Sequence, residues 1–184
     1  MAERGKICGK ESDGLSTHSN LIQSLTGDTG ELVLQFFITF SRFEYALKRA
    51  GFVKNGAYGN ASPDWQRFAK KRLEAQLASI PDTEFTEAKS YLLQKPPQRQ
   101  TYVKSNKSMQ WQNNTKRSEE GEVEYLLRLV RDVRNNLFHG GKYPEKPVSE
   151  QSLRNSKLLQ ACLTILEKCL SLNADVKCFF EERE

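Results

Sequence analysis

Long hydrophobic runs are missing from this 184-residue sequence. The longest one, Leu32 to Phe40, is interrupted by Gln35 and is far shorter than the roughly 20 residues that a membrane-spanning helix needs. Residues 1–20 are polar and contain no apolar segment of the kind found in secretory signals. The sequence therefore predicts a cytoplasmic protein with no membrane attachment.

Cysteine and histidine are also scarce, with four cysteines and two histidines in the whole chain. The cysteines form no Cys-x-x-Cys pair and no cluster with histidine, which argues against both a disulfide framework and a zinc site. Cys162 and Cys169 lie about two helical turns apart, so they should face the core as small hydrophobic residues. We expect a reduced protein that needs no metal and no other cofactor.

Acidic residues are absent from residues 95–117, and the apolar periodicity disappears there as well. We therefore expect a basic loop, in which Tyr102 and Trp111 lie among lysines and arginines. Basic residues with interleaved aromatic rings suit single-stranded nucleic acid, because the charges follow phosphates and the rings stack on bases. The alternative is a solvated loop whose Trp111 packs into the core.

Helical spacing of apolar residues covers most of the remaining chain, and we find no convincing strand. The length suits one domain with a hydrophobic core. We expect an irregular segment over residues 1–27, an all-α domain over residues 28–173 that includes the basic loop, and a C-terminal tail over residues 174–184. The domain should be an up-and-down bundle of four to five helices, the third over about residues 85–93. The net charge of +5 favours polyanionic partners without requiring them.

Capping residues and helix breakers indicate where the first helices begin and end. Asp28 and Glu31 have the spacing of a capping box, so the first helix should begin at Asp28 and end before Gly51. Ser62 and Pro63 should start the second helix, with the serine as N-cap and the proline at the first helical position.

The run from Glu122 to Phe138 predicts a helix with one buried apolar stripe. The stripe comprises Val123, Leu126, Leu127, Val130, Val133, Leu137 and Phe138. Near its end it is interrupted by the polar residues Arg131, Arg134, Asn135 and Asn136. The glycine pair that follows His139 should terminate the helix, which puts His139 in the last turn and Arg134 about 7.5 Å further back along the axis. A permanent cation and a titratable imidazole at one helix end suit a phosphodiester.

Glu44 lies on or beside the apolar face of the first helix, between Phe40 and Leu47. It is either a carboxylate at the edge of that face or the partner that holds the guanidinium of Arg134 in place. A buried glutamate would need such a partner, because burial alone would favour its neutral form.

The segment from Arg134 to His139 resembles the motif of HEPN domains, in which an arginine is followed by a polar residue and, a few positions later, by a histidine. HEPN domains are small helical proteins and often metal-independent ribonucleases, and Asn135 fits the polar position. The resemblance extends from the phenylalanine-rich first helix to the last long helix. It implies a homodimer formed through the motif helices, with two arginines and two histidines in one composite cleft. It also implies a toxin or antiviral effector that an antitoxin or regulatory partner restrains.

Cleavage of RNA without a metal requires proton transfer at the 2′-hydroxyl and the 5′-oxygen, and stabilisation of charge on the phosphorane. His139 could move protons near neutral pH, Arg134 could bind phosphoryl oxygens, and Asn135 or Asn136 could position the ribose or the imidazole. We expect single-stranded or loop RNA, such as a tRNA anticodon, to be cut to 2′,3′-cyclic phosphate and 5′-hydroxyl ends. Arg131 is expected to support this site, and the expected RNA contacts are Lys104, Lys107, Trp111, Tyr102 and Lys142.

Other interpretations of the same residues stay open. Arg134 could be a surface cation and His139 a cap for helix carbonyls. The chain could be a non-catalytic HEPN-like module that binds RNA or nucleotide, or a helical protein that only recruits a partner. A metal hydrolase is the least favoured alternative, because no histidines and carboxylates have ligand spacing.

Overall fold

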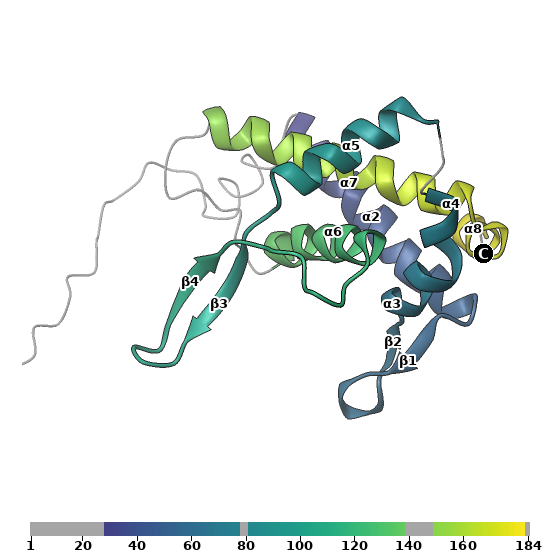
Figure 1. Ribbon diagram of the computed structural model, residues 1–184, viewed down its shortest axis with the longest axis horizontal. Helices are drawn as coiled ribbons and strands as arrows, with labels where there is room; N and C mark the ends of the chain where they lie inside the picture. Colours follow the sequence, from purple (N-terminus) through teal and green to yellow (C-terminus); the bar gives the residue numbers. More distant parts are fainter. Residues whose placement is uncertain (1–27, 78–80, 139–148, 183–184) are drawn as a thin grey trace, which may run out of the picture.

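The computed structural model describes residues 28–77, 81–138 and 149–182, and within them the chain is mostly helical with two small strand pairs (Figure 1). Helix α2, Asp28–Arg49, carries the buried side chains of Phe36, Phe40, Phe43 and Leu47 on one face. It ends as expected at Gly51, which has a positive φ of 83°. The N–H of Phe52 bonds to the carbonyl of Leu47 at 2.8 Å, the pattern by which a glycine closes a helix.

The residues after α2 form a β-hairpin, which the sequence analysis did not predict. Strand β1, Val53–Asn55, pairs antiparallel with β2, Ala61–Pro63, across the short 3-10 helix η1, Ala57–Gly59. The expected helix start at Ser62 and Pro63 is therefore wrong, because both residues belong to β2. The N-cap is Asp64, whose carboxylate accepts a hydrogen bond from the backbone N–H of Arg67 at 3.1 Å.

The second helical segment runs without a break through α3, Trp65–Phe68, the π-turn η2, Ala69–Leu73, and α4, Glu74–Leu77. Its apolar side is buried against the core and comprises Trp65, Phe68, Ala69, Leu73 and Leu77. Helix α5, Thr83–Gln94, follows and is capped by Asp82, which accepts from the N–H of Phe85 at 2.9 Å.

A second hairpin occupies the segment that was expected to be an irregular basic loop. Strand β3, Arg99–Val103, pairs antiparallel with β4, Ser108–Gln112, with Tyr102 opposite Met109 and Gln100 opposite Trp111. The hairpin projects from the helices beside one end of α6 (Figure 1). The expectation of an all-α chain without strands is therefore wrong at two places, although the mostly helical character is confirmed.

Helix α6, Glu122–Phe138, has the bounds that its apolar spacing predicted. Of the predicted stripe, Leu126, Leu127, Val130 and Val133 are buried. Phe138 was expected to be buried at the end of this stripe, and that expectation is wrong, because 54% of it is exposed.

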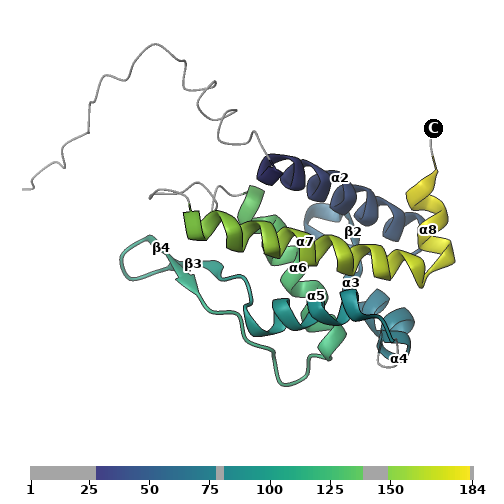
Figure 2. The same ribbon diagram turned by 90° about the horizontal axis from the view of Figure 1, so that it is seen from above.

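The last long helix, α7, Ser149–Ser171, lies between α2 and α5 (Figure 2). Cys162 and Cys169 are fully buried in it, as predicted. The segment expected to be a tail contains helix α8, Ala174–Glu181, which packs against α2 through Val176 and its neighbours. The described residues thus hold six helices, counting 65–77 as one: five within 28–173, where four to five were expected, and α8 in the segment expected to be a tail. None of the described helices is long and apolar enough to cross a membrane.

Candidate functional site

Arg134 lies in the last turn but one of α6 and faces the first helix of the described chain. Its Nη2 atom is 3.7 Å from Oε2 of Glu44 on α2. About a third of the arginine side chain is exposed, at 35%, and 23% of the glutamate side chain. The structure thus brings together the two charged residues that the sequence analysis paired, and it leaves the guanidinium within reach of solvent.

Two aromatic rings flank the guanidinium of Arg134. Its Cζ atom lies 5.3 Å from the ring centre of Phe40 and 5.0 Å from that of Phe138. Phe40 is buried, while Phe138 is exposed and contacts the ring of Phe37 at 5.2 Å. Cation–π contacts within about 6 Å are attractive, so these rings restrict the positions that the arginine can take.

The carboxylate of Glu44 has a second partner, which sequence reasoning missed. The indole N–H of Trp65 donates to Oε1 of Glu44 at 3.1 Å. The indole is buried and stacks on the ring of Phe43, with 5.2 Å between centres and an angle of 9° between planes. A buried indole N–H needs an acceptor, and this requirement was the one signal in the sequence that Trp65 does more than fill the core.

The remaining candidate residues of α6 lie in three different settings. Asn135 lies beside Arg134 and accepts a hydrogen bond from its Nη1 atom at 3.0 Å. Arg131 is exposed one turn earlier on α6. Asn136 is buried, and its Nδ2 atom donates to the carbonyl of Gln98 at 2.7 Å, so it holds the base of the β3–β4 hairpin rather than the guanidinium. His139 and Lys142 lie outside the described residues.

The other expected RNA contacts lie on the β3–β4 hairpin. Tyr102 and Trp111 point to the same face of it, because they occupy alternate positions of paired strands. Lys104 and Lys107 belong to the turn between the strands, where Lys107 has a φ of 52°. All four side chains are exposed. The structure places none of them in contact with Arg134, but the base of the hairpin and the arginine share the end of α6.

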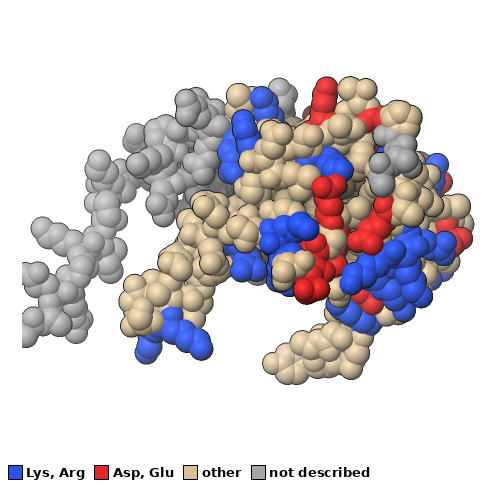
Figure 3. All heavy atoms as spheres, viewed as in Figure 1, with Lys and Arg blue, Asp and Glu red and all other residues tan. Residues whose placement is uncertain are grey.

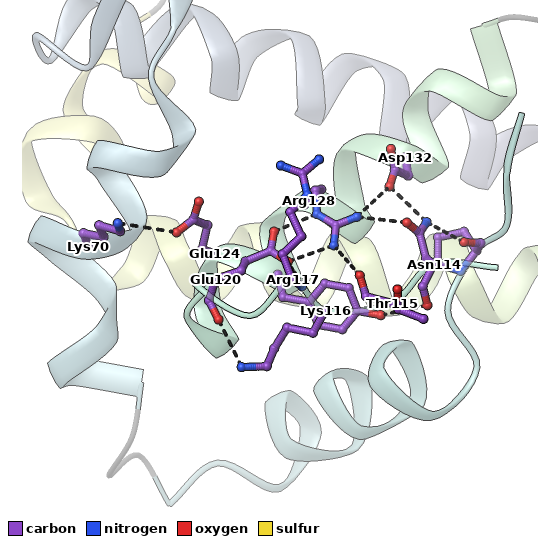
Figure 4. A network of polar contacts seen from close by, with 11 residues as sticks. Lys70, Asn114, Thr115, Lys116, Arg117, Glu120, Glu124, Arg128 and Asp132 are labelled. Carbon is purple, nitrogen blue, oxygen red and sulfur yellow. Dashed lines mark hydrogen bonds and ion pairs between the residues drawn. The ribbon is translucent and has the colours of Figure 1, made fainter. Parts of the chain in front are cut away.

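A buried polar network ties the chain that follows the hairpin to α6 (Figure 4). Arg128 donates from Nε to Glu120 at 2.7 Å and from Nη1 to Asn114 at 2.9 Å. Asn114 in turn donates to the carbonyl of Pro97 at 2.7 Å and to Asp132 at 3.0 Å. The hydrogen bond from Arg128 lowers the pKa of Glu120, and the same bond raises the pKa of Arg128. The network joins both ends of the hairpin segment to the middle of the motif helix.

The arrangement around Arg134 can bind an anion. A guanidinium is always charged and presents a planar set of donors that fits phosphoryl oxygens. Burial raises the pKa of the Cys169 thiol to about 12, which disfavours its reactive thiolate form. Among the described residues, no group of three or more His, Cys, Asp or Glu side chains could hold a metal ion.

No protein-family model matches the chain, and neither a curated protein nor a solved structure matches it significantly.

Proposed function

We propose that this protein is a metal-independent endoribonuclease of the HEPN type that cleaves single-stranded or loop RNA, tRNA among the candidates. The observation that carries the proposal is the setting of Arg134. Its guanidinium is partly exposed, lies between the rings of Phe40 and Phe138, and is paired with a carboxylate that Trp65 holds from behind. Preorganised donors of this kind stabilise charge that develops in a transition state.

In the proposed reaction the 2′-oxygen of a ribose attacks the adjacent phosphorus while its proton leaves to a base. The bond from phosphorus to the 5′-oxygen breaks, and that oxygen takes up a proton. The products are a 2′,3′-cyclic phosphate and a 5′-hydroxyl. Arg134 stabilises the phosphorane, His139 moves the protons, and Asn135 fixes the guanidinium through the bond at Nη1.

One histidine does not readily serve as base and acid at two separate oxygens, so we propose that two copies of the chain combine their motif helices in a HEPN-like dimer. An exposed apolar patch next to Phe138, the ring that flanks Arg134, supports this arrangement. Leu34, Phe37 and Ile38 form one exposed face of α2, and Phe37 contacts the exposed Phe138 of α6. Exposed apolar side chains gathered in one patch are typical of protein–protein contacts. The resemblance further implies a toxin or antiviral role, with an antitoxin or regulator as partner.

The proposed chemistry is tested with a single-stranded RNA, an otherwise identical RNA carrying one 2′-deoxynucleotide at the mapped cleavage position, and the all-DNA oligonucleotide. Attack by the 2′-hydroxyl predicts that the deoxy position and the DNA resist cleavage, while other positions of the RNA are still cut. Product ends should resist 3′ extension until the cyclic phosphate is opened and removed. Cleavage at the deoxy position, or products that end in 5′-phosphate, would exclude this mechanism.

The alternative is a non-catalytic HEPN-like module that binds RNA or a protein partner. The ion pair itself favours it, because the carboxylate of Glu44 already balances part of the charge of Arg134. That alternative predicts RNA binding that survives Arg134→Ala with little change, and no cleavage of any RNA by the dimeric wild-type protein.

A further inference from the structure

The β3–β4 hairpin displays large apolar side chains on one face and leaves them open to solvent. Tyr102 is 65% exposed, Met109 56% and Trp111 40%. The strand register makes Tyr102 and Met109 direct neighbours and Trp111 the next along the same face. Neither aromatic ring stacks on another aromatic ring within the described part of the chain. Since no element of the described chain buries these side chains, they contribute little to the core.

Charge of one sign surrounds this face. The segment 95–117 contains six lysines and arginines and no acidic residue. Lys104 and Lys107 lie at the tip, where Figure 3 shows positive side chains gathered at the far end of the hairpin. Lys116 is used inside the fold, since its Nζ atom donates to the carbonyl of Glu120 at 3.0 Å. The tip lysines are exposed and make no ion pair among the described residues.

The base of the hairpin is joined to α6 by hydrogen bonds. Asn136, two residues after Arg134, donates to the carbonyl of Gln98 immediately before β3. The side chain of Gln98 donates at 3.0 Å to that of Asn113, immediately after β4. The next residue, Asn114, donates to Asp132 of α6. A polymer lying along the hairpin, which extends about 17 Å for five residues per strand, would therefore reach the end of α6 at its base.

We propose that the Tyr102–Met109–Trp111 face is a stacking platform for unpaired nucleobases, with Lys104 and Lys107 holding the phosphates of the same strand. This inference deepens the proposed ribonuclease function, because it assigns the surface that holds the substrate. The role of this surface in RNA cleavage rests on the proposed function. Every base has a π-face, so the platform accepts bases of any sequence and does not distinguish ribose from deoxyribose. It excludes duplexes, because their bases are stacked on each other and not available to the rings.

The test measures anisotropy of a fluorescein-labelled single-stranded oligodeoxynucleotide, which the proposed ribonuclease cannot cleave. Wild-type protein should bind it, and should bind the corresponding duplex at least tenfold more weakly. Trp111→Ala and Tyr102→Ala should each weaken single-strand binding by about tenfold or more. Gln110→Ala, on the opposite face of the same hairpin, is the matched control and should leave the affinity unchanged.

The lysines are tested by the salt dependence of the same binding. Each phosphate contact in a single strand contributes about 0.7 to the slope of log K against log salt, so Lys104→Ala with Lys107→Ala should reduce the slope by about 1.4. Lys71→Ala removes one exposed charge from the helix 65–77 and should not alter the slope.

Equal binding of single strand and duplex, or unchanged binding by Trp111→Ala and Tyr102→Ala, would overturn the platform. If the hairpin face instead docks a protein, oligonucleotide binding should be unchanged in Trp111→Ala and Tyr102→Ala, and the oligomeric state of Trp111→Ala should change. The two proposals fail separately. Platform binding without RNA cleavage would refute only the ribonuclease, and RNA cleavage with unchanged oligodeoxynucleotide binding in the ring variants would refute only the platform.

Discussion

Trp65 and Arg134 contact opposite oxygens of one carboxylate. The indole N–H of Trp65 bonds to Oε1 of Glu44 at 3.1 Å, and Nη2 of Arg134 lies 3.7 Å from Oε2. Three elements, α2, α3 and α6, therefore meet at Glu44. The tryptophan approaches the carboxylate from the core and the arginine approaches it from the partly exposed side. The buried indole therefore orients the carboxylate, and the carboxylate orients the guanidinium.

Trp65→Phe should lower the rate of RNA cleavage without reducing RNA binding. The phenyl ring keeps the stack on Phe43 but removes the donor to Glu44, so the guanidinium loses part of its orientation. We expect kcat to fall about tenfold with little change in KM, since small misplacements of a catalytic group are costly. The free energy of unfolding should fall by about 1–2 kcal/mol.

A double-mutant cycle separates this positioning role from a general loss of stability. If Trp65 acts through Glu44, Trp65→Phe should have no further effect on kcat in a Glu44→Ala background. Additive losses of kcat would show instead that Trp65 affects the site by another route.

Ile38→Lys should convert the proposed dimer into a monomer, because it places a charge within the exposed apolar face of α2. Ile38 is largely exposed, and Arg134 is held by Glu44, Asn135, Phe40 and Phe138, so loss of cleavage in this variant would report assembly and not damage to the guanidinium. Light scattering gives the mass, and Val53→Lys on the distant β1 strand is the control. A wild-type monomer that cleaves RNA would contradict the composite site.

Glu120→Gln should destabilise the fold by about 2–4 kcal/mol at neutral pH, because the amide removes the negative charge paired with Arg128 and replaces one of its two acceptor oxygens with a donor in a largely buried place. The folded protein has a lowered pKa at Glu120. Its contribution is therefore complete above the unfolded pKa of about 4.3 and is lost as the pH falls through the folded value. Urea unfolding from pH 7 to pH 3 should show the wild-type and variant curves converging in acid. A gap that stays constant would contradict the ionised pair.

The reactivity of the cysteine thiols should show whether the core around α7 is packed as described. In a Cys8→Ser background, Cys178 is exposed while Cys162 and Cys169 are buried. Burial raises the pKa of Cys169 to about 12, so very little thiolate forms there at pH 8. Ellman's reagent should label one thiol quickly in the folded protein and three in urea. Rapid labelling of all three without denaturant would mean that α7 is not packed as described.

Most of the helices were predictable from sequence because their burial follows a 3.6-residue period, although α8 was taken for a tail and the start of the second helix was misplaced. Helix α6 has the expected bounds, and Glu44 faces Arg134 because both residues interrupt apolar faces that meet in the core. Phe138 was misassigned, since the end of a buried stripe is the place where burial stops.

The hairpins were not predictable in the same way. Strand signals depend on alternation between a buried and an exposed face, and β3–β4 buries neither face fully: Tyr102, Met109 and Trp111 are exposed on one side and Gln110 on the other. The partner of Trp65 and the use of Asn136 at the hairpin base depend on contacts between residues far apart in sequence. Local sequence patterns do not indicate such long-range contacts.

The most direct measurement is cleavage of end-labelled total RNA in excess EDTA by the wild type, Arg134→Ala and His139→Ala, with Lys71→Ala as the charge-matched control. Circular dichroism and light scattering check that the four proteins are equally folded and have the same oligomeric state. The proposed site predicts chelator-resistant cleavage to 2′,3′-cyclic phosphate by the wild type and Lys71→Ala, and its loss in both motif variants. Absence of cleavage by the dimeric wild type across several RNAs, or unchanged cleavage in Arg134→Ala, would contradict it.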